Sequence, residues 1–220
     1  MTKFGLVFLV MLGASGAWGI VRGGVTHRER QHPSVARNER LTALTGAILY
    51  VLLVAIVATV LDISGLLPEH YLVGFLVIPP VGLKMGSTGY RLARYYAGDD
   101  RYRLAGAPRF VLRFVVAPVL VGSTLAVLVT GVELWLFGLR FGDGWMAAHT
   151  VTAVVMLSAV AVHILAHMRR SAESVRDLAA PTREALSGRS LVVGSLLLGA
   201  VLAVASLLYS SPFPPSAAGG

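Results

Sequence analysis

The chain has 220 residues, of which 55% are hydrophobic and only 14% are charged. A soluble domain of this size cannot bury so much apolar surface, so most of the chain must lie in a lipid bilayer. The formal net charge of +8 would favour nucleic acid as a partner of a soluble protein, but here the arginines occupy short segments between apolar runs, which is typical of membrane topology. The lack of cysteine excludes disulfides, thiolate zinc sites and iron–sulfur clusters within this chain.

Six apolar runs are long enough to cross the hydrocarbon layer as helices. In chain order they cover residues 4–21, 41–62, 70–90, 111–138, 145–167 and 190–210. These runs are too long and continuous for the alternating strands of a barrel, and a helix satisfies its own backbone in lipid. The sequence therefore predicts an all-α integral membrane bundle, with a single transmembrane domain over 1–210 and a disordered tail over 211–220.

The run 4–21 has a second interpretation as a cleaved signal peptide, because Lys3 precedes it and small residues at 15–17 offer a cleavage site. Cleavage there would export an arginine-rich segment, which the positive-inside rule disfavours. Sixteen of the 19 basic residues lie in three segments, 22–40, 91–113 and 168–189. We expect these segments on the cytoplasmic side of the inner membrane, with both termini outside.

Histidines at membrane depth are the strongest functional signal, because ionisable groups are costly in lipid. His149 and His163 are 14 residues apart, which on a helix is about 21 Å of rise and within about 40° of the same face. A pair so placed can hold two haems stacked across the membrane. His70 opens the third run at the depth of His149, so these two can face each other across an outer haem. The alternative for each histidine is an interhelical hydrogen bond.

Lys84, His167 and Glu133 are further candidates. Lys84 lies at the depth of His163, where it can ligate an inner haem as a neutral amine, pair with a haem propionate, or extend to the cytoplasmic surface. His167, one turn beyond His163, is an alternative ligand, a propionate partner or an interfacial residue. Glu133, in the outer half of the fourth run, can take protons from a quinol or tune the haem potential, or it can be protonated and hydrogen-bonded to a neighbouring helix.

Two stretches resemble the bacterial membrane cytochrome b proteins, which are the haem-bearing subunits of hydrogenases, formate dehydrogenases and molybdopterin oxidoreductases. One runs from His70 through Lys84 to the Ser-Thr-Gly-Tyr-Arg sequence at 87–91, and the other runs from His149 to the His-Ile-Leu-Ala-His sequence at 163–167. The resemblance covers about residues 41–170. It implies a four-helix haem-binding core made by spans two to five.

The resemblance further implies haem b, with His70, His149 and His163 as iron ligands, and electron transfer between a quinone pool and a separate redox subunit. Such a protein is an electron-transfer subunit rather than a stand-alone enzyme. The family pattern has a fourth histidine, where this sequence has Lys84 instead. The number of haems, one or two, is therefore left open. The residues alone also allow a haem-free ion- or proton-coupled transporter, for which no internal repeat is evident, or a non-catalytic anchor or assembly subunit.

Overall fold

The computed structural model describes residues 32–105, 112–177 and 183–214. Its long helices are α2 (Pro33–Thr59), α3 (Leu67–Tyr96), α5 (Ala117–Phe137), α6 (Gly144–Asp177) and α7 (Arg183–Ser206). Three short elements join them, namely η1 (Val60–Asp62), α4 (Asp100–Leu104) and the π-helical turn η2 (Leu112–Val116). The described ranges contain no strand, and the all-α prediction is confirmed.

Five helices are long and apolar enough to cross a membrane, so the chain is a multi-pass membrane protein. They correspond to the second to sixth predicted spans. The first predicted span, 4–21, and its alternative as a signal peptide lie outside the described residues. Large apolar side chains such as Val51, Val129 and Leu197 are exposed, each by at least 60%, which is the arrangement expected of a surface that faces lipid.

The helices extend beyond the apolar runs that predict them. α2 begins at Pro33 rather than at 41, because a proline at the first helical position and the cap by His32, whose Nδ1 accepts from the Ser34 N–H at 3.3 Å, define an earlier start. α3 likewise continues to Tyr96 instead of ending at 90. Hydropathy marks the part of a helix that lies in lipid, whereas capping residues mark where the helix starts and stops.

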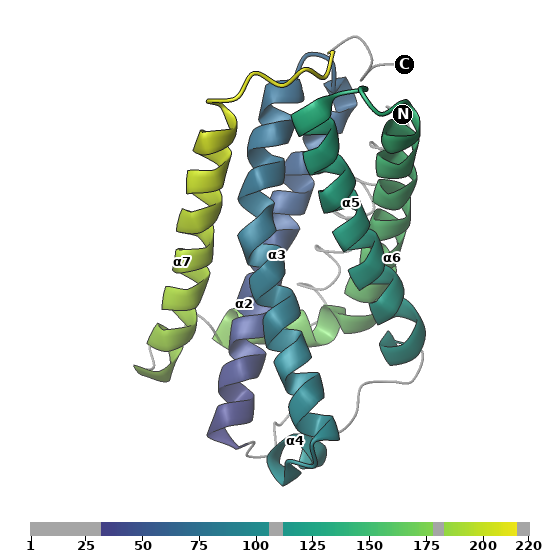
Figure 1. Cartoon of the computed structure of the whole chain (residues 1–220). Helices are drawn as coiled ribbons and strands as arrows, with labels where there is room; N and C mark the ends of the chain where they lie inside the picture. The colour runs from purple at the N-terminus through teal and green to yellow at the C-terminus, as the bar shows by residue number, and fades with distance from the viewer. Residues whose placement is uncertain (1–31, 106–111, 178–182, 215–220) are drawn as a thin grey trace.

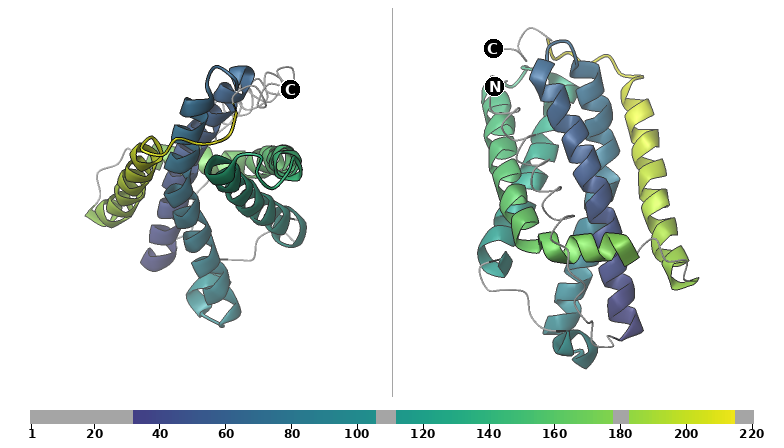
Figure 2. Two further views of the ribbon diagram at one scale, coloured as in Figure 1. Left: turned by 45° about the horizontal axis from the view of Figure 1, so that its top comes forward. Right: turned by 180° about the vertical axis from the view of Figure 1, so that it is seen from behind.

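The helices form two layers. α2, α3 and α7 pack side by side in one layer, and α5 pairs with α6 in the other (Figure 2). The last part of α6 turns and runs across the bundle towards α7 (Figures 1 and 2). The starts of α2, α5 and α7 lie at the same end as the last turns of α3 (Figure 1). We call this the basic end, because the three arginine-rich segments adjoin it, and we call the other the opposite end.

The close packing of α3 against α7, within one layer, involves a proline of α3 and a glycine of α7. α3 stays helical through Pro79 and Pro80, but Pro80 has no N–H to donate to the Leu76 carbonyl one turn earlier. Gly199 of α7 lies directly against that carbonyl, and a Cβ at this position would overlap its oxygen. The missing side chain therefore lets the two helix backbones approach at the point where the carbonyl is left without its helical donor.

The first residues of the tail that the sequence predicts to be disordered, 211–214, are described and cross the opposite end of the bundle (Figure 1). Phe213 is buried there in a cluster with Leu67 and Leu134, which belong to different layers. Gly138 ends α5 with a φ of +60°, and its open α-carbon accommodates the tail backbone. A single buried aromatic side chain thus gives ordered packing to a segment of low-complexity composition.

Candidate functional site

His70 and His149 meet at the opposite end of the bundle. His70 lies in the first turn of α3, and His149 lies in the second turn of α6, so both helices present a histidine soon after they start. Their ring centroids are 6.4 Å apart and their planes are inclined at 83°. Both residues are half-buried in this part of the bundle. The structure therefore brings together the two histidines that the sequence places at one depth.

Thr59, the last residue of α2, fixes the ring of His70. Its Oγ1 lies 2.8 Å from Nδ1 of His70 and donates its own proton to the Ile56 carbonyl at 2.6 Å. A hydroxyl has one proton to give, so towards the imidazole it acts as the acceptor, and Nδ1 of His70 carries the hydrogen. Thr59 is buried, which protects this pair from exchange with water.

Thr130 of α5 does the same for His149. Its Oγ1 lies 3.1 Å from Nδ1 of His149, and its proton goes to the Ala126 carbonyl at 2.7 Å, with a longer contact to Val127. Thr130 is also buried. The two halves of the site thus repeat one arrangement, in which a buried threonine at one helix orients a histidine on the neighbouring helix.

The consequence is that both imidazoles have Nδ1 protonated and leave the lone pair on Nε2. A hydrogen bond at one ring nitrogen commonly prepares the other nitrogen to bind a metal. Two imidazoles that bind one metal ion from opposite sides, with nitrogen–metal bonds of about 2 Å, have ring centroids roughly 6 Å apart. The observed 6.4 Å between His70 and His149 is close to that spacing.

Gly131 gives His149 its room. A Cβ at this position of α5 would lie 3.0 Å from Cε1 of the His149 ring, which is too close for an undisturbed contact. The imidazole therefore packs against bare helix backbone, next to the threonine that orients it. By residue type alone a glycine in such a helix indicates only close helix approach, whereas the structure places Gly131 against the ring.

Glu133 lies one turn along α5 from Thr130. Both of its carboxylate oxygens are buried, and within the described residues neither has a hydrogen-bond partner. An unpartnered carboxyl group in such surroundings is costly, and a protonated carboxyl or a bound donor relieves that cost. The predicted alternative of a hydrogen bond to a neighbouring helix is not among the contacts of the described chain.

Lys84 lies in a polar seam between α2 and α3, nearer the basic end. Its Nζ donates to the Thr42 carbonyl at 2.6 Å and lies where a Cβ on Gly46 would be only 3.0 Å away. Ser87 continues the seam, since its Oγ accepts from Thr42 Oγ1 at 3.0 Å and its carbonyl accepts from Asn38 Nδ2 at 3.1 Å. In this structure the amine therefore joins two helices of one layer.

His163 and His167 both lie on α6, beyond its midpoint. His163 is half-buried. The side chain of His167 lies outside what the structure describes. The assignment of Lys84, His163 and His167 as ligands of an inner haem therefore stays a prediction.

Thr59 and Thr130 are the site residues that sequence reasoning missed. A threonine in a transmembrane helix is commonly satisfied by its own helix backbone, so its residue type carries no signal. The signal available is positional, since both threonines lie at the depth of the facing histidines. Only the rotation of each helix, which packing sets, decides that the two hydroxyls point at the imidazoles.

Within the described ranges, no cluster of three or more histidine, aspartate or glutamate side chains is able to hold a bare metal ion. The chain was compared with protein-family models, with curated proteins and with solved structures, and none of them matches it.

Proposed function

We propose that this protein is a membrane-bound b-type cytochrome that transfers electrons between a quinone pool and a redox partner. The observation that carries the proposal is the pair His70 and His149, whose rings are 6.4 Å apart and whose Nδ1 atoms are both engaged by threonine hydroxyls. A porphyrin supplies the equatorial nitrogens of its iron, so the protein needs to add only an axial pair.

The residues of the site fit haem b. The Nε2 lone pairs of His70 and His149 would hold the iron of such a group, and Gly131 lets the His149 ring pack against the backbone of α5. Haem b, when bound, supplies a one-electron couple between ferric and ferrous iron. The threonines hold each imidazole in one tautomer and one orientation, which raises the basicity of Nε2 and stabilises the higher oxidation state of a bound iron.

Glu133 supports the quinone part of the proposal. A quinol that gives up electrons must also release protons, and a carboxylate that has no hydrogen-bond partner among the described residues is a suitable acceptor. Its place one turn from Thr130 puts it on the helix that also orients His149. In the proposal Glu133 accepts the quinol proton and passes it towards the nearby end of the bundle.

A second haem, nearer the basic end, would use His163 as a ligand, with Lys84 or His167 as the further candidate. Lys84 has to give up its hydrogen bond to the Thr42 carbonyl in order to ligate. The proposal therefore includes one haem at His70 and His149. The haem count per chain decides whether a second, inner haem is also present.

The proposed location is the inner membrane with the basic end on the cytoplasmic side. The chain ends of α2, α3, α5 and α7 that adjoin the arginine-rich segments gather at one end of the bundle (Figure 1), and such segments are retained in the cytoplasm. In the proposal the electrons pass to an extrinsic redox subunit or another electron-transfer protein.

The test is a reduced-minus-oxidised visible spectrum of the purified protein, with a pyridine haemochrome count of haem per chain. We expect a b-type spectrum with one or two haems. His70→Ala and His149→Ala should each remove the same haem. The absence of haem from the wild-type protein, produced with ample haem supply, would refute the proposal and favour the transporter or anchor functions.

His32→Asn is the matched control. His32 lies outside the site, at the basic end, where its Nδ1 caps α2 through Ser34. Asparagine retains the capping ability, so this variant should keep the full haem content. Full haem content in both His70→Ala and His149→Ala would show that the axial assignment is wrong even if the protein is a cytochrome.

A further inference from the structure

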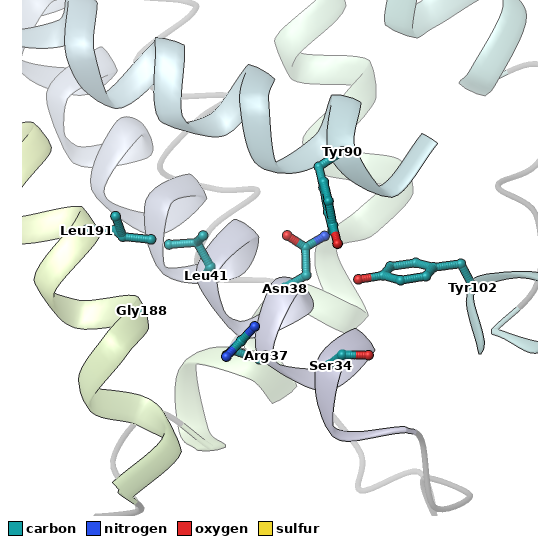
Figure 3. Close-up of a pocket in the computed structure, with 8 residues that line it drawn as sticks. All are labelled: Ser34, Arg37, Asn38, Leu41, Tyr90, Tyr102, Gly188 and Leu191. Atoms are coloured by element: carbon teal, nitrogen blue, oxygen red, sulfur yellow. The ribbon is translucent and has the colours of Figure 1, made fainter. Parts of the chain in front are cut away.

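A pocket of about 330 Å³ lies at the basic end, away from the histidine site. α2 contributes half of its lining, and single residues from α3 and α4 and two from α7 close it (Figure 3). Its volume is at the lower end of the range of small-molecule sites. Four helices, α2, α3, α4 and α7, therefore line one space at the basic end.

One side of this pocket is polar and carries a positive charge. Arg37, Asn38 and Ser34 line it from α2, and the ring hydroxyls of Tyr90 and Tyr102 lie on the same side as Asn38 (Figure 3). No acidic residue is in the lining. The Asn38 amide already donates to the Ser87 carbonyl and the Ser34 hydroxyl contacts His32, so the guanidinium of Arg37 and the tyrosine hydroxyls are the groups that suit a phosphate group.

Arg37 is available for an added anion. Neighbouring arginines of the same region are already neutralised, because Arg91 pairs with Glu39 at 3.0 Å and Arg94 pairs with Asp99. Among the described residues Arg37 has no such acidic partner, and its side chain is exposed. The pocket thus contains an arginine, Arg37, whose positive charge has no acidic partner among the described residues.

The other side of the pocket is apolar. Leu41 and Leu191 face each other across it (Figure 3), and Leu191 is 53% exposed. Gly188 lies beside Leu41 and has no side chain to occupy this side. A Cβ built on Gly188 would lie 4.0 Å from Cβ of Leu41. α2 and α7 continue from these residues into their membrane-spanning parts, so the apolar side leads directly to lipid.

We propose that this pocket binds one anionic phospholipid, with its phosphate on Arg37 and the start of its acyl chains between Leu41 and Leu191. A polar, positively charged side joined to an apolar side at a membrane surface matches the two parts of a phospholipid. A free phosphate shares the first contact but makes no use of the second. The proposal does not depend on haem binding.

Native mass spectrometry of the full-length protein, titrated with phosphatidylglycerol or phosphatidylcholine, tests it. We expect a saturable site that prefers phosphatidylglycerol, with affinity about tenfold lower in Arg37→Gln, which loses a charged hydrogen bond. Arg140→Gln is the matched control, because Arg140 is an exposed arginine at the opposite end, and it should bind as the wild type does. Equal binding by the two variants would overturn the proposal.

Gly188→Leu and inorganic phosphate distinguish lipid from free phosphate. Leucine at 188 fills the apolar side, so it should weaken phosphatidylglycerol binding about tenfold and leave phosphate binding unchanged. Displacement of the lipid by inorganic phosphate at equal concentration, or normal lipid binding by Gly188→Leu, contradicts a lipid site. If Arg37→Gln does not fold, Tyr90→Phe and Tyr102→Phe provide the second measurement, and wild-type lipid affinity in both would count against the pocket.

Discussion

Thr59 Oγ1 accepts a hydrogen bond from Nδ1 of His70 while it donates to the carbonyl of Ile56. The helix backbone thus fixes the direction of the hydroxyl, and the hydroxyl fixes the tautomer of the imidazole. The same chain of two bonds runs from Ala126 through Thr130 to His149. Each histidine is held through a threonine by an element that does not carry it, so four helices together determine where the two Nε2 atoms lie.

Replacing Thr59 or Thr130 by valine should weaken haem binding about tenfold, the lower end of the effect of losing a partner behind a metal ligand. It should also raise the midpoint potential, because an imidazole without its acceptor donates less charge to iron. The measurements are haem retention during dilution and a redox titration. Thr124→Val is the control, since among the described residues Thr124 Oγ1 donates to the Leu120 carbonyl of its own helix and contacts no histidine. The same change in Thr124→Val would mean that loss of any hydroxyl on α5 suffices.

Gly199→Ala should lower the free energy of unfolding by about 1–3 kcal/mol, as overpacking typically does. The added methyl meets the Leu76 carbonyl, which is backbone and does not move aside. Gly194→Ala on the same helix has open space and should leave stability unchanged or slightly raised. Denaturation in mixed detergent micelles compares the two. Equal stability of both variants would show that α7 does not pack on α3 as described.

Lys84→Met should destabilise the bundle by about 1–3 kcal/mol through loss of the charged hydrogen bond to Thr42, and it should leave the haem at His70 and His149 in place. Thermal denaturation and the haem count measure the two effects. Loss of half of the haem from a two-haem protein would instead assign Lys84 as the ligand of the inner haem, and its contact with α2 would then be a feature of the haem-free chain.

Asp99 makes the corner between α3 and α4 sensitive to acid. Hydrogen bonds from Arg101, with a further one from Arg94, hold the pKa of the Asp99 carboxyl at about 2, below its ordinary 3.8. A lowered pKa contributes stability above the ordinary value, and this contribution is lost as the pH falls through about 2. The apparent Tm of the wild type should therefore fall more steeply than that of Asp99→Asn between about pH 4 and pH 2. Parallel curves for the two proteins would contradict this.

Apolar runs of suitable length predict the helices, because lipid leaves the backbone no alternative to satisfying itself. The sequence could also predict the shared depth of His70 and His149, since both open a helix that enters from the same end. It could not predict the helix rotations that turn Thr59 and Thr130 towards the rings. Nor could it predict that Lys84 bonds a carbonyl of α2, because backbone acceptors have no signature in residue type.

The described part of the tail, residues 211–214, shows a related limit of sequence reasoning. Composition identifies residues 211–220 as low in complexity, but one aromatic side chain is enough to order part of such a segment when a cavity of the right shape is present. Phe213 packs in such a place, in one buried cluster with Leu67 and Leu134. The shape exists only once α3 and α5 have packed, so it is a property of the tertiary structure and not of the segment.

The crossing of this tail has a mechanical consequence. Tyr209 donates from its hydroxyl to the Leu136 carbonyl at 2.7 Å, and Phe213 is anchored a few residues later, so α7 in one layer is fastened to α5 in the other. The link lies at the opposite end of the bundle, where His70 and His149 also meet. It therefore helps to hold the two layers, and with them the two histidines, in a fixed position relative to one another.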